Sequence, residues 1–168
     1  DGLTDDYVRV IFEDRTRRLW FGTRGGGLNY LKDGTFNSYT SANGLSNDFI
    51  RCIHEDGEGD LWIGTRGGGI NRFKDNRFTA VTTRDGLYDD TVHKILQDNH
   101  GNIWMSSNKG IFKVSLHELK SFCDGEIQNI KCILYNEKDG LKSRECNGIS
   151  QPHGWKSRDG RLWFPTMK

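Results

Sequence analysis

The protein has 168 residues, with 24 lysines and arginines against 23 aspartates and glutamates. This near balance excludes the strong basic excess that marks a nucleic-acid-binding domain. The chain has 9 phenylalanines, 5 tryptophans and a net charge of only +1, which excludes an intrinsically disordered segment. No apolar run approaches the roughly 18 residues needed to span a membrane. The 21 glycines favour short strands joined by tight turns.

The sequence repeats with a period of 42 residues. Tryptophan recurs at this interval, at Trp20, Trp62 and Trp104. A Gly-Leu pair recurs at the same interval, at 2–3, 44–45 and 86–87, and once more at 140–141. The next tryptophan of the series, Trp163, comes 59 residues after Trp104, which places an insertion in the third unit.

The first unit contains four β-prone runs separated by glycine and aspartate. We expect strands at 7–14, 18–23, 28–32 and 36–40, with the first strand lining a central channel and the fourth outermost. The first run has counterparts at 49–56 and 91–98. Helical periodicity is absent from these runs. Four strands in about 40–45 residues are typical of one β-propeller blade.

The third unit departs from this pattern after its third strand. Residues 115–123 predict a short helical insertion whose apolar residues share one face. Ser115 stands at its start and is expected to cap the first turn. The outer strand of the unit is then delayed, and we expect it at 130–136.

These units together predict an all-β fold, a β-propeller fragment with three four-stranded blades and the first strands of a fourth. Residues 1–168 form one partial propeller in this interpretation, with units at 1–42, 43–84 and 85–138 and a partial unit at 139–168. Propellers typically have about 4–8 blades. We therefore expect the missing strands to come from a longer chain or from a second copy of this one.

An aspartate stands six residues before the tryptophan in three units, at Asp14, Asp56 and Asp98. Its carboxylate can accept backbone N–H bonds across the turn between the first two strands. The motif resembles the Asp-box of sialidases, where it is structural, and its recurrence favours a structural role here. The fourth unit has Ser157 in place of the aspartate.

The repeated tryptophans are expected to pack between blades; they are Trp20, Trp62, Trp104 and Trp163. The alternative is a set of stacking platforms for sugars. Triple-glycine runs at 25–27 and 67–69 lie between two strands and have no Lys-Ser/Thr after them. They therefore predict tight turns rather than a phosphate-binding loop.

No catalytic constellation is found in the sequence. Neighbouring carboxylates such as Glu13 and Asp14 point to opposite faces of a strand, and no serine elbow or zinc-protease motif is present. The four cysteines form no Cys-x-x-Cys pair; they are Cys52, Cys123, Cys132 and Cys146. We therefore expect no catalytic residue, no metal and no cofactor, and a disulfide among the last three cysteines stays open.

One rim of the propeller is the candidate binding surface. The turn between the second and third strands lies at the same end of a blade as the connection into the next blade. The turns carry cations and the connections carry acids, and the third unit breaks the repeat at its turn. The candidate ligand-binding residues are Arg24, Arg66, Ser107, Asn108, Lys109, Asp48 and Asp90. They predict a rim suited to a polar ligand or a protein partner; the alternative is a solvated loop surface with local ion pairs.

Residues 59–70 read Gly-Asp-Leu-Trp-Ile-Gly-Thr-Arg-Gly-Gly-Gly-Ile and resemble the two-component regulator propeller repeat. The first unit matches nearly as well, with Arg17 where glycine is usual, and the third has Met105-Ser106-Ser107 in place of Ile-Gly-Thr. Segments 139–148 and 159–164 resemble the closing blade of such propellers.

The resemblance implies a sensor. Propellers of this family form the extracytoplasmic input region of bacterial receptors whose outputs are histidine kinases or diguanylate cyclases. It implies a periplasmic location, a small molecule or oligosaccharide as ligand, no nucleic acid, and contact with the membrane only through other parts of the receptor. A second copy that completes or pairs the propeller is a further expected partner. The family motif contains no universal ligand residues, so the resemblance identifies no binding residues in this chain.

Two alternatives remain: a propeller enzyme, such as a streptogramin-type lyase or a glycosidase, and an interaction scaffold without a small ligand. An enzyme requires histidines or carboxylates that are unique to one unit and converge at one rim. His100, His117 and His153 are unique, but the repeat places them in a turn of the opposite rim, in the insertion and in an inner strand. We therefore predict that this segment is not itself an enzyme.

Overall fold

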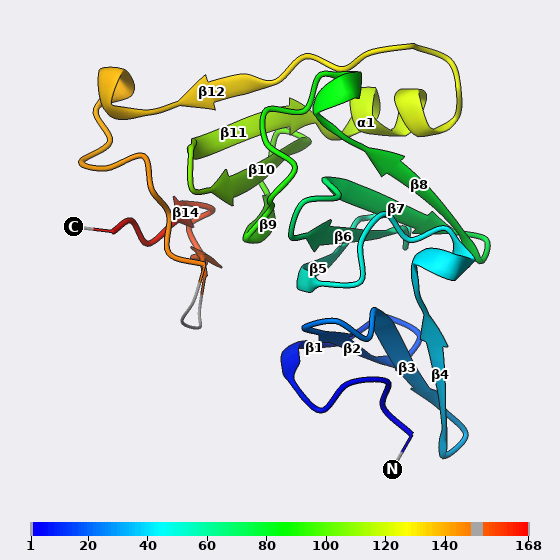
Figure 1. The fold of residues 1–168 in the computed structure, drawn as a ribbon. Helices are drawn as coiled ribbons and strands as arrows, with labels where there is room; N and C mark the ends of the chain where they lie inside the picture. Colours follow the sequence, from blue (N-terminus) through cyan, green and yellow to red (C-terminus); the bar gives the residue numbers. More distant parts are fainter. Residues whose placement is uncertain (1, 149–152, 168) are drawn as a thin grey trace.

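The computed structural model describes residues 2–148 and 153–167. This part of the chain forms three four-stranded antiparallel sheets and one two-stranded sheet (Figure 1). The sheets confirm the predicted propeller fragment, with three blades and the first strands of a fourth. Of the predicted partial unit at 139–168, residues 149–152 and 168 lie outside the described residues.

Each four-stranded sheet follows the chain in order, because tight turns join successive strands. The first sheet contains β1 (Val8–Glu13), β2 (Leu19–Thr23), β3 (Leu28–Lys32) and β4 (Thr35–Tyr39). The second contains β5 (Ile50–Glu55), β6 (Leu61–Thr65), β7 (Ile70–Lys74) and β8 (Arg77–Val81). The third contains β9 (Lys94–Gln97), β10 (Asn102–Ser107), β11 (Gly110–Ser115) and β12 (Ile133–Tyr135).

Shorter elements complete the fold. Strand β13 (Trp155–Lys156) pairs with β14 (Leu162–Trp163) as the start of the fourth sheet. Single 3-10 turns follow the outer strands; they are η1 (Ser41–Asn43), η2 (Thr83–Asp85) and η3 (Glu137–Asp139). The helix α1 (Leu116–Cys123) lies between β11 and β12.

The sheets fan out around a common axis, with their first strands innermost and their fourth strands outermost (Figure 1). Strand β5 contacts β1 on one side and β9 on the other. Glycine permits this close approach: a Cβ atom on Gly22 would lie 2.5 Å from Ile50 Cγ2 and 2.6 Å from Val10 Cγ1. The glycine that follows Leu-Trp-Phe or Leu-Trp-Ile is therefore a packing requirement of the inner strands.

Apolar side chains fill the spaces between adjacent sheets. One cluster joins the first and second sheets and includes Trp20, Leu28, Ile50, Ile63 and Phe73. A second cluster joins the second and third sheets and the helix, and includes Trp62, Ile70, Ile103, Phe112 and Leu119. Because each cluster draws on two sheets, the hydrophobic free energy of roughly 25 cal/mol per Å² buried holds neighbouring blades together.

The third unit differs from the prediction in two details. Ser115 occupies the N-cap position of α1 but makes no side-chain capping bond, so the predicted serine cap is wrong. The reason is that Ser115 still belongs to β11, where it pairs with Asn102, so the strand rather than the helix positions its side chain. The outer strand is shorter than 130–136 because Ile130 leaves the sheet, buries its side chain and donates its N–H to the Asp85 carbonyl.

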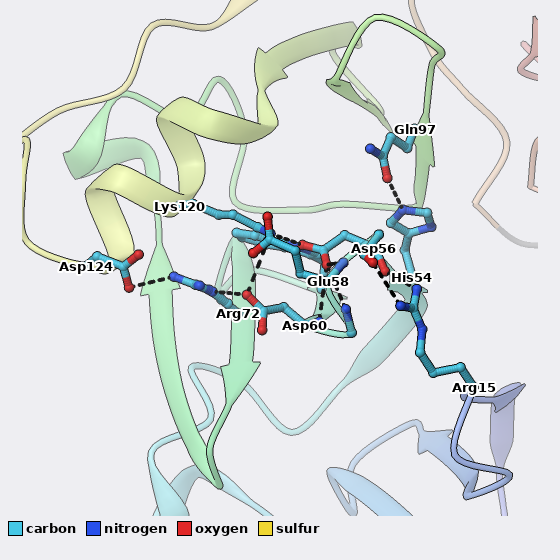
Figure 2. Close-up of polar contacts among 12 residues, drawn as sticks. Arg15, His54, Asp56, Glu58, Asp60, Arg72, Gln97, Lys120 and Asp124 are labelled. Atoms are coloured by element: carbon cyan, nitrogen blue, oxygen red, sulfur yellow. Dashed lines mark hydrogen bonds and ion pairs between the residues drawn. The ribbon is translucent and has the colours of Figure 1, made fainter.

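A polar network fixes α1 on the second sheet (Figure 2). Lys120 Nζ lies 2.9 Å from Asp56 Oδ2 and 2.8 Å from Glu58 Oε2. Arg72 of β7 lies 2.6 Å from Asp60 and 2.8 Å from Asp124, which follows the helix. Because buried charges are tolerated only when they are paired, these ion pairs define one position for the insertion.

Candidate functional site

In the first three units, one aspartate organises the turn between the first two strands. Its Oδ1 accepts backbone N–H bonds from residues two and four positions later. Its Oδ2 accepts the indole N–H of the tryptophan at 2.8 Å (Asp14–Trp20), 3.0 Å (Asp56–Trp62) and 2.8 Å (Asp98–Trp104). Burial alone would raise the pKa of the Asp98 carboxyl, but the bonds from Trp104 and Asn102 hold it at about 2. Both oxygens of each of these carboxylates are therefore used by hydrogen bonds within the unit.

The four repeated tryptophans differ in what their rings contact. Trp20 packs against Phe73 of the next sheet, with ring centroids 5.5 Å apart, and Trp62 is fully buried between the second and third sheets. Trp104 instead stacks on Tyr135 of its own sheet at 5.2 Å. Trp163 is 57% exposed, which differs from the expected packing between blades, because no further sheet follows β14 within the described residues.

The β2–β3 and β6–β7 turns meet the connections into the next sheet at one rim. The Gly27 N–H donates to the Asp48 carbonyl at 2.9 Å, and the Gly69 N–H donates to the Asp90 carbonyl at 2.8 Å. Glycine is required in both turns, because φ is +75° at Gly27 and +71° at Gly69. The turns and the connections therefore form one continuous surface.

Four of the seven candidate rim residues are occupied by local contacts. The carboxylate of Asp48 accepts the N–H and hydroxyl of Ser41, and that of Asp90 accepts the same groups of Thr83. Ser107 is fully buried. Lys109 Nζ lies 3.3 Å from Asp89 Oδ1. These four residues shape the rim but do not line its cavity.

The other three candidates, Arg24, Arg66 and Asn108, line a cavity of about 370 Å³ at this rim. All four units contribute to it, and its lining also includes Arg9, Phe49, Arg51, His93, Glu145 and Gly148. The lining thus holds four arginines against the single carboxylate of Glu145, whereas the whole chain carries a net charge of only +1. Positive charge is concentrated here.

Two aromatic rings contact these arginines. The guanidinium carbons of Arg51, Arg66 and Arg24 lie 5.0, 5.2 and 6.0 Å from the ring centroid of Phe49. Arg24 also lies 5.2 Å from the centroid of Tyr7. A cation over a ring face is attracted by its quadrupole by about 0.5–1 kcal/mol at exposed sites. Three cations of the lining thus lie around one phenyl ring.

Within the lining, two arginines share one backbone carbonyl of the fourth unit. Arg9 Nη2 and Arg51 Nη1 both donate to the Gly148 carbonyl, at 2.9 and 2.5 Å. A Cβ atom on Gly148 would lie 2.5 Å from Nδ1 of His93, so only glycine fits against that ring. The first and second inner strands are therefore tied to the fourth unit at this point.

Three of the four arginines of the cavity form no ion pair with a described carboxylate. No described carboxylate lies within 4.0 Å of Arg24, Arg51 or Arg66. Burial lowers the pKa of the Arg51 guanidinium, and the nearby charges of Arg9 and Arg66 lower it further. The buried Nε of Arg51 has no hydrogen-bond partner among the described residues.

Two buried histidines lie beside these arginines. His93 is 2% exposed, and its Nε2 lies 2.7 Å from Oδ1 of Asn108. Burial lowers its pKa, with a smaller contribution from Arg51. His153 is 3% exposed, and burial followed by the charges of Arg9 and His93 lowers its pKa to about 4. Both imidazoles are neutral at pH 7, so the charge of the cavity comes from its arginines.

The sequence prediction missed the inner-strand part of this site. Arg9, Arg51 and His93 occupy the same position in three successive units, 42 residues apart, on the strand expected to line the channel. That recurrence of basic side chains was the available signal. Recurrence in every unit favours a structural role in the blade, so it does not by itself mark these basic side chains as a binding site.

The structure brings together no catalytic or metal-binding group within residues 2–148 and 153–167. His100 and His117 are exposed at separate places, and no described imidazole bonds to a carboxylate. No cluster of three metal-ligating side chains is found in these ranges. All four cysteines are free, and burial raises their thiol pKa values, to about 12 for Cys52 and about 11 for the other three.

The two-component regulator propeller family model matches residues 2–25 and 44–67. Each segment spans the first two strands of a unit and the arginine of the following turn, and the match confirms the resemblance recognised in the sequence. No curated protein matches the chain in sequence. Within the described residues, no helix has the length and apolar character needed to cross a membrane.

The fold is similar to the extracellular domains of two proteins from Bacteroides thetaiotaomicron that are described as hybrid two-component systems. The first shares 23% identity and a TM-score of 0.76 over 96% of this chain and 21% of that chain. The second shares 23% identity and a TM-score of 0.74 over 98% of this chain and 22% of that chain. The present chain thus spans about a fifth of their length. Virginiamycin B lyase from Staphylococcus aureus shares the fold at 15% identity and a TM-score of 0.67, over 96% of this chain and 50% of the lyase.

Proposed function

We propose that this chain is part of the extracytoplasmic sensory propeller of a bacterial signal-transduction receptor, with a histidine kinase or a diguanylate cyclase as its output. The two-component regulator propeller repeats at 2–25 and 44–67 support this assignment. The likeness in fold to extracellular domains of two-component systems supports it as well.

The observation that carries the proposal is the rim cavity of about 370 Å³, which all four units line. Its volume falls within the roughly 300–1,000 Å³ of small-molecule sites. A ligand shifts a receptor between two states only when it binds them with different affinity. Because a cavity shared by several blades changes shape when the blades shift, it is suited to that task.

A propeller enzyme is the second candidate, since the lyase shares the fold. General acid–base catalysis needs a proton donor or acceptor within about 2.6–3.2 Å of its partner group. The two buried histidines near the cavity have no carboxylate bonded to their rings among the described residues, and arginines surround them. This arrangement favours binding over proton transfer.

The gene that encodes this chain provides the first test. A reading frame that continues through a membrane-spanning helix into a kinase or cyclase domain supports the proposal. A frame that leads only into catalytic lyase or glycosidase elements contradicts it. Proteinase K added to spheroplasts is expected to cleave this segment of the full protein while a cytoplasmic control protein stays intact, and protection of the segment would exclude an extracytoplasmic location.

A further inference from the structure

We infer that the rim cavity is a receptor site for a small polyanion, a molecule that carries at least two carboxylate, sulfate or phosphate groups. The inference deepens the proposed function, on which it rests, by naming the chemical class of the ligand. It assigns the binding contacts to Arg24, Arg51 and Arg66, with Phe49 as the residue that positions them.

The first argument is geometric. The guanidinium carbons of Arg24, Arg51 and Arg66 all lie within 6.0 Å of one ring centroid, so a molecule of modest size can reach all three. A guanidinium presents N–H donors in a planar fork that matches the two oxygens of a carboxylate, sulfate or phosphate. Stacking on Phe49 restricts each fork to a few orientations and lowers the entropy lost on binding.

The second argument is electrostatic. The lining contains four arginines and one carboxylate, and the Glu145 side chain is exposed. At this rim the carboxylates of Asp48 and Asp90 serve the 3-10 turns, that of Asp5 accepts the N–H of Tyr7, and that of Asp89 pairs with Lys109. Clustered charges of one sign raise the local concentration of the opposite ion and the rate at which it binds. A multiply charged anion neutralises this cluster, whereas a monoanion leaves most of it unbalanced.

The third argument is the state of Arg51. Its Nη1 donates to the Gly148 carbonyl, which fixes the plane of the group, while its buried Nε has no partner among the described residues. A buried donor without an acceptor is unfavourable, because it has given up its hydrogen bonds to water and gained none in return. An anionic oxygen in the cavity supplies that acceptor.

Isothermal titration calorimetry on the 168-residue chain at low ionic strength tests the inference, because screening weakens such contacts. The polyanion probes are pyrophosphate and citrate, and the comparison molecules are sulfate, which is a single anionic group, acetate, which is a monoanion, and sucrose, which is neutral. We expect at least one polyanion to bind, and acetate and sucrose to give no heat. Binding of pyrophosphate alone, of citrate alone or of sulfate as well supports the site and identifies the preferred group.

Three substitutions that each remove one positive charge locate the site. Arg24→Gln and Arg66→Gln change exposed side chains of the cavity, and Arg84→Gln changes an exposed arginine of η2 outside it. Loss of one charge-assisted contact of about 1.5 kcal/mol or more is expected to weaken binding about tenfold in the first two variants. Arg84→Gln is expected to bind like the parent. Circular dichroism confirms that each variant is folded.

Two results would overturn the inference: no polyanion binding with a Kd below about 1 mM, or equal weakening by Arg84→Gln and Arg66→Gln. Phe49→Leu adds a further check, since it keeps every charge and removes the ring that orders the guanidiniums. Binding without a membrane receptor in the gene leaves the site standing and removes the sensory proposal. A receptor gene together with absent binding leaves the sensory proposal standing and removes the polyanion site.

Discussion

Replacing Arg72 with methionine tests the buried ion pairs that dock the helical insertion. The Arg72 guanidinium is 3% exposed and lies 2.6 Å from the Asp60 carboxylate, which is 8% exposed and has Lys120 at 4.0 Å as its other cation. Removing one partner of a buried pair costs about 3–5 kcal/mol, because the remaining charge stays buried and unpaired. Since Lys120 stays close, we expect a loss of about 3 kcal/mol in the free energy of unfolding, or about 6–12 °C in Tm.

A second substitution separates the charge effect from lost packing. Asn102 stands in the third unit at the position of Asp60, so asparagine fits this turn. The double variant Arg72→Met/Asp60→Asn leaves no buried unpaired charge, since the Asp124 carboxylate is 47% exposed, and we expect it to be about 1–2 kcal/mol more stable than Arg72→Met alone. Arg17→Met, which removes an exposed pair with Glu13, should leave the stability nearly unchanged, because water screens that pair. Urea denaturation followed by tryptophan fluorescence measures all three. A double variant that is no more stable than the single one would refute the reasoning.

Four further predictions follow from other contacts. Gly22→Ala should lose about 1–3 kcal/mol of stability in urea denaturation, because its Cβ would overlap a side chain of the next inner strand. Gly57→Ala is the matched control, since a Cβ there has no atom within 4 Å. An equal loss of stability in both variants would contradict the packing argument. The pKa of Asp98 is lower in the folded protein, at about 2, so its contribution to stability is present above about pH 4 and is lost as pH falls toward 2. Asp98→Asn should therefore flatten the pH dependence of stability in that window, and an unchanged profile would count against the assignment. The Cys52 thiol, with a pKa of about 12, should resist a thiol reagent at pH 8 until the protein unfolds. Phe49→Leu should weaken polyanion binding by less than Arg66→Gln does, since it removes order but no charge.

The architecture could be predicted from the sequence because the repeat encodes it locally. Predicted strands at 18–23 and 28–32 differ by at most one residue from β2 and β3. Alternating apolar residues, glycine turns and the aspartate before each tryptophan act over a few residues, so one unit contains nearly all the information for one sheet. The cap at Ser115 failed because a strand residue competed for the same position.

The candidate site could be predicted only in part, because it depends on how the sheets curve around the axis. Arg24 and Arg66 were found from topology, since two adjacent turns define a rim. Arg51 and Gly148 are 97 residues apart, and their contact follows from the angle between sheets, which no local pattern reports. The carboxylates of Asp48 and Asp90 were expected to face a ligand, but each accepts the hydroxyl and the N–H of the first residue of a 3-10 turn, seven residues earlier in the chain.

The single carbonyl of Gly148 receives guanidinium bonds from Arg9 on the first sheet and Arg51 on the second. Any change in the angle between those sheets must lengthen or break at least one of these bonds. Coupling of this kind is reciprocal: if an anion binds Arg51 more tightly at one angle between the sheets, its binding favours that angle, and holding the sheets at that angle raises the affinity for the anion. The Gly148 carbonyl thus links the binding of an anion by Arg51 to the angle between the first two sheets.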